Sequence, residues 1–144
     1  MNIEFEKEIA YVLKQIGINQ DLKGYKYIKY ATDLIMQDDK YLDFITKELY
    51  PALAEQFHTR PTAVERAIRH AVENCFNNAD AKVIELMFGN SIPANKDKPT
   101  NTHFLAALVE LMRFISVPDT HTDIYSAAPR NETVVRFVER MKGA

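Results

Sequence analysis

The sequence predicts an all-α protein: a compact multi-helix domain that contains a helix-turn-helix and carries an extra C-terminal helix. Two observations lead to this prediction. Apolar residues recur at three- and four-residue spacing along most of the chain, which is the helical period, and no stretch shows a convincing strand alternation. Glycine, proline and paired aspartate interrupt the helical segments, as expected at helix ends.

Size and composition bound the class of protein. A chain of 144 residues that is 47% hydrophobic can bury the core of one domain. The formal net charge of −2 means that any nucleic-acid binding needs a local basic face. The single cysteine, Cys75, excludes an internal disulfide. Neither an apolar run of about 18–20 residues nor a signal peptide is seen, so we expect a cytoplasmic protein without a membrane span.

Three helices are expected before the central motif. They cover residues 3–16, 25–36 and 42–49. The first stops at Gly17, and Gly24 punctuates the connection that follows it. Asp38-Asp39 breaks the second helix, and Pro51 kinks or restarts the third because proline lacks a backbone donor.

The central stretch ALAEQFHTRPTAVERAIRHAVENCF indicates two helices joined by a tight turn, the shape of a helix-turn-helix. The first helix ends near Phe57 and the second starts near Thr62. Thr62 and Glu65 have the spacing of a capping box. His58 stands where such a turn often needs a left-handed residue, which histidine tolerates better than most.

The outer face of the second helix carries the chemistry. Arg66 and Arg69 are spaced i and i+3, so they point the same way. An arginine can donate twice to guanine, worth about 1–3 kcal/mol against a wrong base, and Glu65 can accept from cytosine. The alternative is a solvated helix face with one cap. His70, beside the arginines, is explained equally well as a packed or capping side chain.

Two more helices are expected after the motif, the first over residues 81–88. Thr100 or Asn101 caps the second, and the polar loop between the two helices contains Lys96 and Lys98.

The last part of the chain divides the molecule into two regions. We expect the main domain over residues 1–115 and a linker plus helix over residues 116–144. Asn131 caps that helix, which has an apolar stripe of Val134, Phe137, Val138 and Met141. The stripe either folds back on its own domain or serves as a dimer contact or docking helix for another protein.

The order of short motifs in this chain resembles a known family. KGYKYIKYA, ITKELYPALAEQF, VERAIRHAVE, MFG and KPTN follow one another between Ile16 and Phe114. Their order is similar to that in the C-terminal DNA-binding effector domain of the stage-zero sporulation response regulator. The resemblance implies a helical domain that binds a short box of double-stranded DNA as a tandem, head-to-tail pair and regulates transcription.

The resemblance also implies where DNA is contacted. Glu65, Arg66 and Arg69 face the bases, and Thr62 is a phosphate or cap position. Loop and helix N-terminal residues hold the backbone, as helix N-termini do for phosphates. The full expected set is Arg60, Thr62, Glu65, Arg66, Arg69, His70, Lys96, Lys98, Thr100 and Asn101.

This chain departs from the family pattern at several points. Family members usually carry arginine before the VER triplet, where this chain has Ala63, and Arg60-Pro61 replaces small hydroxylated residues in the turn. We therefore expect a preferred DNA box that differs from the family's. The family normally has a receiver domain ahead of the effector; the sequence is expected to be either an excised piece or a receiver-less relative.

These features predict a sequence-specific DNA-binding transcriptional regulator of the sporulation type. Its expected partners are DNA, a second copy in tandem, and a regulator protein or RNA polymerase. The alternative is an interaction module that does not bind DNA and pairs with a full-length regulator or another protein through its C-terminal helix. No nucleophile–base pair or glycine-rich phosphate loop is present, and the histidines lack metal-site spacing, so we expect no enzyme, cofactor or metal.

Overall fold

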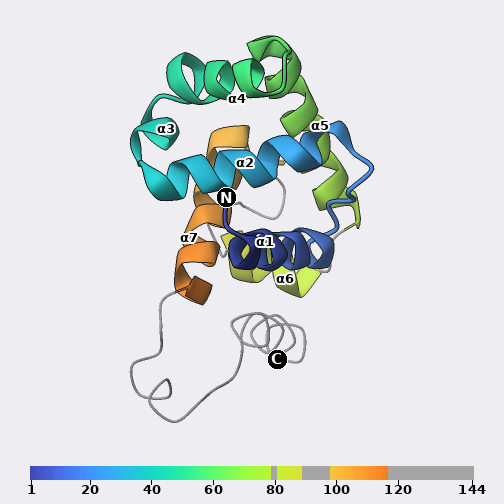
Figure 1. Ribbon diagram of the computed structural model, residues 1–144. Coiled ribbons are helices and arrows are strands. Elements are labelled where there is room, and N and C mark those ends of the chain that lie inside the picture. The colour runs from blue at the N-terminus through green and yellow to red at the C-terminus, as the bar shows by residue number, and fades with distance from the viewer. Residues whose placement is uncertain (79–80, 89–97, 117–144) are drawn as a thin grey trace, which may run out of the picture.

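The computed structural model describes residues 1–78, 81–88 and 98–116, and all regular structure in these ranges is helical (Figure 1). This confirms the predicted fold class. The expected C-terminal helix with its apolar stripe lies outside the described residues. The elements are α1 Ile3–Gln15, α2 Lys23–Gln37, α3 Lys40–Asp43, η1 Ile45–Leu49, α4 Tyr50–Gln56, α5 Pro61–Asn78, α6 Ala81–Phe88 and α7 Asn101–Ser116.

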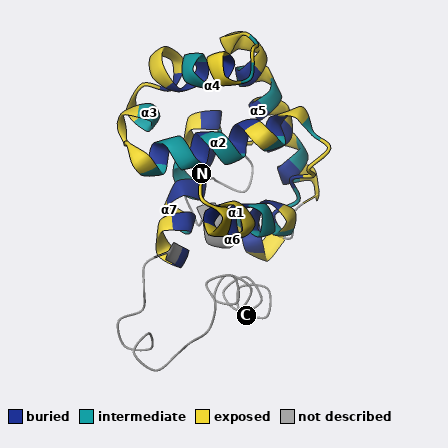
Figure 2. Ribbon diagram, viewed as in Figure 1, coloured by how far each residue is buried: buried dark blue, intermediate teal, exposed yellow. Residues whose placement is uncertain are grey.

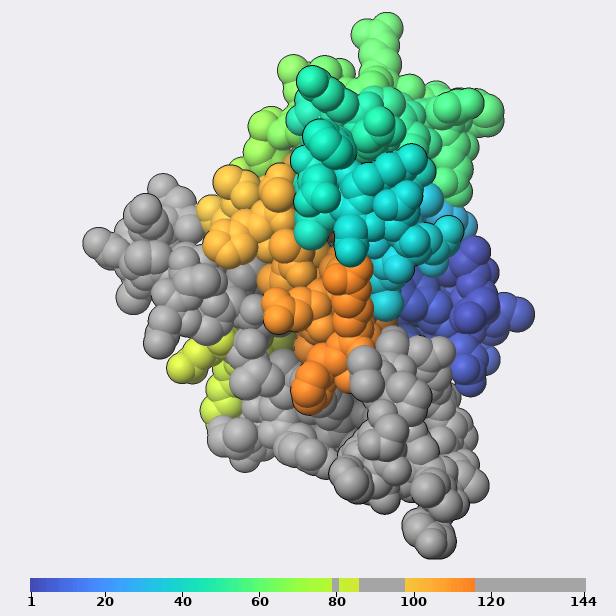
Figure 3. Space-filling model, turned by 90° about the vertical axis from the view of Figure 1, so that its left-hand side faces the viewer, coloured from blue at the N-terminus to red at the C-terminus, as the bar shows by residue number. Residues whose placement is uncertain are grey.

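Helix α2 is the centre of the arrangement. It packs against α5 and α7, while α1 lies across its lower side and α4 crosses the upper end of α5 (Figure 1). Turned by a quarter, the molecule shows α7 running down one face beside α2 and α3 (Figure 3). The second helix of the predicted motif, α5, is therefore held from two sides by helices that are distant in the sequence.

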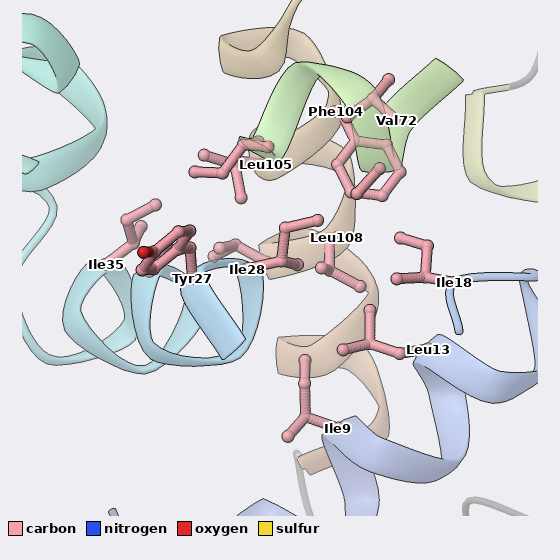
Figure 4. Packing of buried hydrophobic residues seen from close by; sticks show 14 of the residues in the cluster. Ile9, Leu13, Ile18, Tyr27, Ile28, Ile35, Val72, Phe104, Leu105 and Leu108 are labelled. Atoms are coloured by element: carbon pink, nitrogen blue, oxygen red, sulfur yellow. The ribbon is translucent and has the colours of Figure 1, made fainter. Parts of the chain in front are cut away.

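The core lies where α1, α2, α5 and α7 meet, and apolar side chains from all four helices point into it (Figure 4). The longer helices bury an inward stripe and expose their outward side, whereas the four-residue α3 buries none of its residues (Figure 2). The apolar residues of α5, which recur at the helical spacing noted in the sequence, form its buried face. Its fully or nearly fully buried members are Val64, Ile68, Ala71, Val72 and Cys75.

Cys75 brings a buried thiol to this face. Its thiol donates to the backbone carbonyl of Ile16, with Sγ and the oxygen 3.1 Å apart. Burial raises the pKa of the Cys75 thiol to about 12, because the thiolate would have to form away from water.

Gly24 has a different role from the one the sequence suggests. It lies in the first turn of α2 rather than in the preceding connection, and it is buried. A Cβ at this position would overlap the backbone carbonyl of Ala67 and come within 2.8 Å of the Cβ of Ala71. Glycine is therefore required here because α2 and α5 approach each other backbone to backbone.

Replacing Gly24 by alanine is expected to destabilise the domain. The added methyl group would push α2 from α5, and overpacking of this kind costs about 1–3 kcal/mol, more than alanine gains in helix propensity. Urea unfolding should show a lower midpoint for Gly24→Ala and an unchanged one for the exposed neighbour Lys23→Ala. Equal midpoints for Gly24→Ala and wild type would contradict this prediction, because they would mean that α2 and α5 can move apart to fit the methyl group without loss of stability.

The segment before the motif is less regular than expected. A single helix was predicted over residues 42–49, but the chain forms the short α3, breaks at Phe44 and continues as the π-helical turn η1. The amides of Glu48 and Leu49 both donate to the carbonyl of Phe44, at 2.7 and 3.3 Å. A wide turn just ahead of Pro51 leaves room for the proline ring, which in an α-helix meets the carbonyl four residues back. Pro51 then stands as the second residue of α4, so the helix restarts there.

No helix in the part of the chain that the structure describes is long and apolar enough to cross a membrane.

Candidate nucleic-acid interface

The turn between α4 and α5 is a Schellman motif closed by a histidine. The amide of Thr59 donates to the carbonyl of Ala54 at 2.9 Å, and that of His58 to Glu55 at 3.4 Å. His58 has φ of 54°, so the left-handed conformation predicted for it is confirmed. The end of α1 shows the same pair of bonds, with Gly17 at the left-handed position.

Aromatic packing holds the end of α4 against α2. The ring of Phe57 meets Tyr27 and Tyr30 edge-on, with centroids 5.3 and 5.1 Å apart. The ammonium of Lys26 lies 5.1 Å from the centroid of Phe57. Such edge-on and cation–π contacts each contribute about 0.5–1.5 kcal/mol beyond area burial. The turn is thus held to the body of the domain immediately before α5 begins.

The start of α5 differs from the predicted capping box. The helix begins at Pro61, which is suited to a first helical position because its missing donor is not needed there. Thr62 is therefore already inside the helix, and Glu65 pairs with Arg69 instead of reaching back. The capping-box prediction was wrong, since proline one residue earlier sets the helix start. The carbonyl of Arg60 accepts from the amide of Val64 at 3.1 Å.

The outer face of α5 is open to solvent over its first three turns. Arg66 is exposed and makes no ion pair or hydrogen bond within the described residues. Arg69 is also exposed, but its Nη1 lies 2.8 Å from Oε1 of Glu65. An exposed i, i+4 pair of this kind contributes only about 0.3–0.5 kcal/mol, so Arg69 is held weakly. Other exposed members of this face are Thr62, Ala63, His70 and Glu73.

A cleft of about 660 Å³ lies beside this face, between η1, α5 and the start of α7. Lys98 and Thr100 are at its edge, and both are exposed. The Thr100 hydroxyl accepts from the amide of His103 at 3.1 Å, which confirms Thr100 as the predicted cap of α7. The other lining residues are Ile45, Thr46, Tyr50, Glu65, Arg69, Val72, Glu73, Pro99, Asn101 and Thr102.

Of the expected contact residues near the cleft, one is buried and one lies outside the described residues. Asn101 is only 9% exposed and its amide nitrogen donates to the Tyr50 hydroxyl and to the Glu65 carbonyl, at 3.1 Å each. Both of its amide hydrogens are used inside the protein, so this arrangement offers neither to a DNA phosphate. Lys96 lies outside the described residues.

Tyr50 and Thr46 also line the cleft, although no sequence motif indicates a role for them. Burial raises the pKa of the Tyr50 hydroxyl above its usual range, although the hydrogen bond from Asn101 acts in the opposite direction. The hydroxyl is therefore neutral at physiological pH. Thr46 lies in η1 and Tyr50 begins α4, so only the packing of these elements against α5 brings the two side chains to the cleft. Within the described residues, no group of three or more His, Cys, Asp or Glu side chains could hold a metal ion.

The fold and the exposed, arginine-bearing second helix define a helix-turn-helix domain of the kind that docks on DNA. Residues 9–112 match the family described as sporulation initiation factor Spo0A C terminal. The chain belongs to this family, which confirms the resemblance seen in its motifs. The family consists of DNA-binding effector domains that regulate transcription in sporulation, and it is not a family of enzymes.

The left-handed conformation of His58 predicts that glycine stabilises the protein at this position and destabilises it at His70. His58→Gly should raise the free energy of unfolding by up to about 1 kcal/mol, because glycine adopts positive φ without the penalty of a Cβ. His70→Gly, inside exposed α5, should lower it by about 1 kcal/mol. Thermal unfolding of both variants checks this; a destabilised His58→Gly would show that the imidazole makes contacts worth more than the strain.

Proposed function

We propose that this protein is a sequence-specific transcriptional regulator that inserts α5 into the major groove of double-stranded DNA, in the cytoplasm. The observation that carries the proposal is the exposed guanidinium of Arg66, which has no partner among the described residues and lies in the second turn of a helix held by the core. Near-N-terminal residues of a recognition helix reach base edges, and arginine is the side chain best suited to guanine. Membership of a DNA-binding family supports the same reading.

Arg69 and Glu65 act as a second, exchangeable element of base reading. Their pair is exposed and weak, so a guanine can replace Glu65 as the partner of Arg69 at small cost. Glu65 is then free to accept from a cytosine amino group. His70 lies on the same side of the helix, one residue beyond Arg69, and completes the proposed base-facing set.

Phosphate contacts are proposed on both sides of the base-facing set. Arg60 and Thr62 are exposed at the turn that leads into α5. Lys98 and Thr100 stand at the edge of the cleft, where the first turn of α7 adds the positive end of a helix dipole. Such contacts fix the register of the protein on the duplex without reading sequence. Lys96 belongs to the same proposal through the family resemblance alone, as does tandem binding of a second copy.

The alternative function is an interaction module that keeps the fold but has lost duplex affinity. The net charge of −2 favours it, since phosphate neutralisation supplies most of the affinity of DNA-binding proteins. Ala63 favours it as well, because an exposed position in the first turn of α5 carries no donor. Its partner would be a full-length regulator, RNA polymerase or another protein.

Removing the guanidinium of Arg66 is expected to relax base preference at one position. The probe is a duplex that the wild-type chain selects from a random pool. At one base pair of this duplex, Arg66→Ala should discriminate against the wrong base by about 1–3 kcal/mol less than wild type does. Competition binding against single-base variants of that duplex measures this loss. Arg113→Ala is the matched control. Arg113 lies in the last turn of α7, away from α5, and pairs with Asp39.

Titration with salt separates the two functions. A regulator that neutralises several phosphates shows a steep linear fall of log affinity with log salt. The interaction module shows little duplex affinity at any salt and no selected sequence. An Arg66→Ala variant that keeps full discrimination would place base reading elsewhere on the surface.

Restoring the arginine that other family members carry generates a complementary prediction. Ala63→Arg should tighten duplex binding, increase the salt slope by about one and add a base preference next to that of Arg66. Binding assays at two salt concentrations and a repeated selection measure these effects. Ala81→Arg adds the same charge at an exposed site on α6 and should add no base preference. Identical behaviour of the two variants would reduce the role of position 63 to general electrostatics.

A further inference from the structure

A single amide group ties together three helices that come from distant parts of the chain. Asn101 begins α7, Tyr50 begins α4, and Glu65 lies in the second turn of α5. The Nδ2 atom of Asn101 donates to the Tyr50 hydroxyl and to the Glu65 carbonyl, each at 3.1 Å. An amide nitrogen carries two hydrogens, so this pair of bonds uses its full donor capacity.

We propose that Asn101 is a positioning residue that sets the base preference of α5 by fixing its place relative to α4. The inference rests on the proposed function, in which α5 reads DNA. The bond reaches the carbonyl of Glu65, and this carbonyl belongs to the rigid peptide unit that leads into Arg66. Asn101 therefore holds the backbone at the residue on which base reading depends.

The burial of this group makes its bonds matter. Asn101 and Tyr50 are 9% and 7% exposed, so water does not readily replace a lost partner. The Glu65 carbonyl also accepts the regular helical bond within α5, and its second lone pair receives the Asn101 amide. The contact is thus an additional restraint on a formed helix, and it is not needed to form that helix.

The restraint has the precision that base reading requires. A bidentate arginine–guanine contact tolerates only small errors, since hydrogen bonds weaken steeply with misalignment and functional side chains must be held within about 0.5 Å. Phosphate contacts by long, flexible side chains tolerate larger displacements. Loss of the Asn101 restraint should therefore reduce sequence-specific affinity more than non-specific affinity.

The test compares two dissociation constants for each variant at a temperature where all variants are folded. One probe is a duplex selected by the wild-type chain from a random pool, and the other is a shuffled duplex of the same length and composition. Asn101→Ala removes both bonds, and Tyr50→Phe removes one while keeping the ring. Asn78→Ala is the matched control, because among the described residues the Asn78 amide donates to Asn74 at the far end of α5.

We expect Asn101→Ala to reduce the ratio of specific to non-specific affinity by about tenfold, the size of one good base contact, with non-specific affinity nearly unchanged. Tyr50→Phe should give a smaller loss and Asn78→Ala none. An unchanged ratio overturns the inference, whether both affinities stay the same or both weaken equally. A merely structural role of Asn101 predicts such an unchanged ratio.

Three further outcomes also decide between the inference and its alternatives. Should Asn101→Ala fail to fold, Tyr50→Phe decides: a reduced ratio supports the inference and an unchanged ratio overturns it. Failure of the wild-type chain to prefer any selected duplex overturns the proposed function and the inference with it. A wild type that discriminates beside an Asn101→Ala that discriminates equally well overturns the inference alone.

Discussion

The backbone contact between α2 and α5 determines what the rest of the domain can present. At Gly24 the two helices touch without an intervening side chain, and the Ala67 carbonyl lies too close for a Cβ to fit. Because α5 is held this tightly on its inner side, its rotation about its own axis is restricted. Its outward residues, Arg66 among them, consequently form a face of defined direction. The aromatic contacts of Phe57 hold the turn that leads into this helix, and the bond from Asn101 restrains its second turn.

Features with a local physical cause were predictable from the sequence. The left-handed His58 follows from the steric demand of a short turn, and the Thr100 cap follows from side-chain chemistry at a helix start. The buried stripe of α5 follows from its periodicity. The capping box failed because Pro61 competes for the helix start, and spacing alone does not rank the two signals.

Features with a tertiary cause were not predictable in the same way. Gly24 looks like a loop residue until the partner helix is in place, and Asn101 looks like a surface cap until Tyr50 and Glu65 surround it. The π-helical turn before Pro51 leaves no periodic trace in the sequence. Of the site itself, the exposed position of Arg66 was predictable, but the pairing of Arg69 with Glu65 competes with a base-facing role that spacing permits equally.

The buried thiol of Cys75 is expected to react very slowly with reagents in the folded protein. Reaction with oxidants and alkylating agents proceeds through the thiolate, and a pKa of about 12 leaves almost none at neutral pH. The thiol also donates to the carbonyl of Ile16, the residue that ends α1, so reagents reach it only when the packing around this bond opens. The rate at which the native protein reacts with a thiol label therefore measures how often the core opens. No cysteine has to be introduced for this measurement.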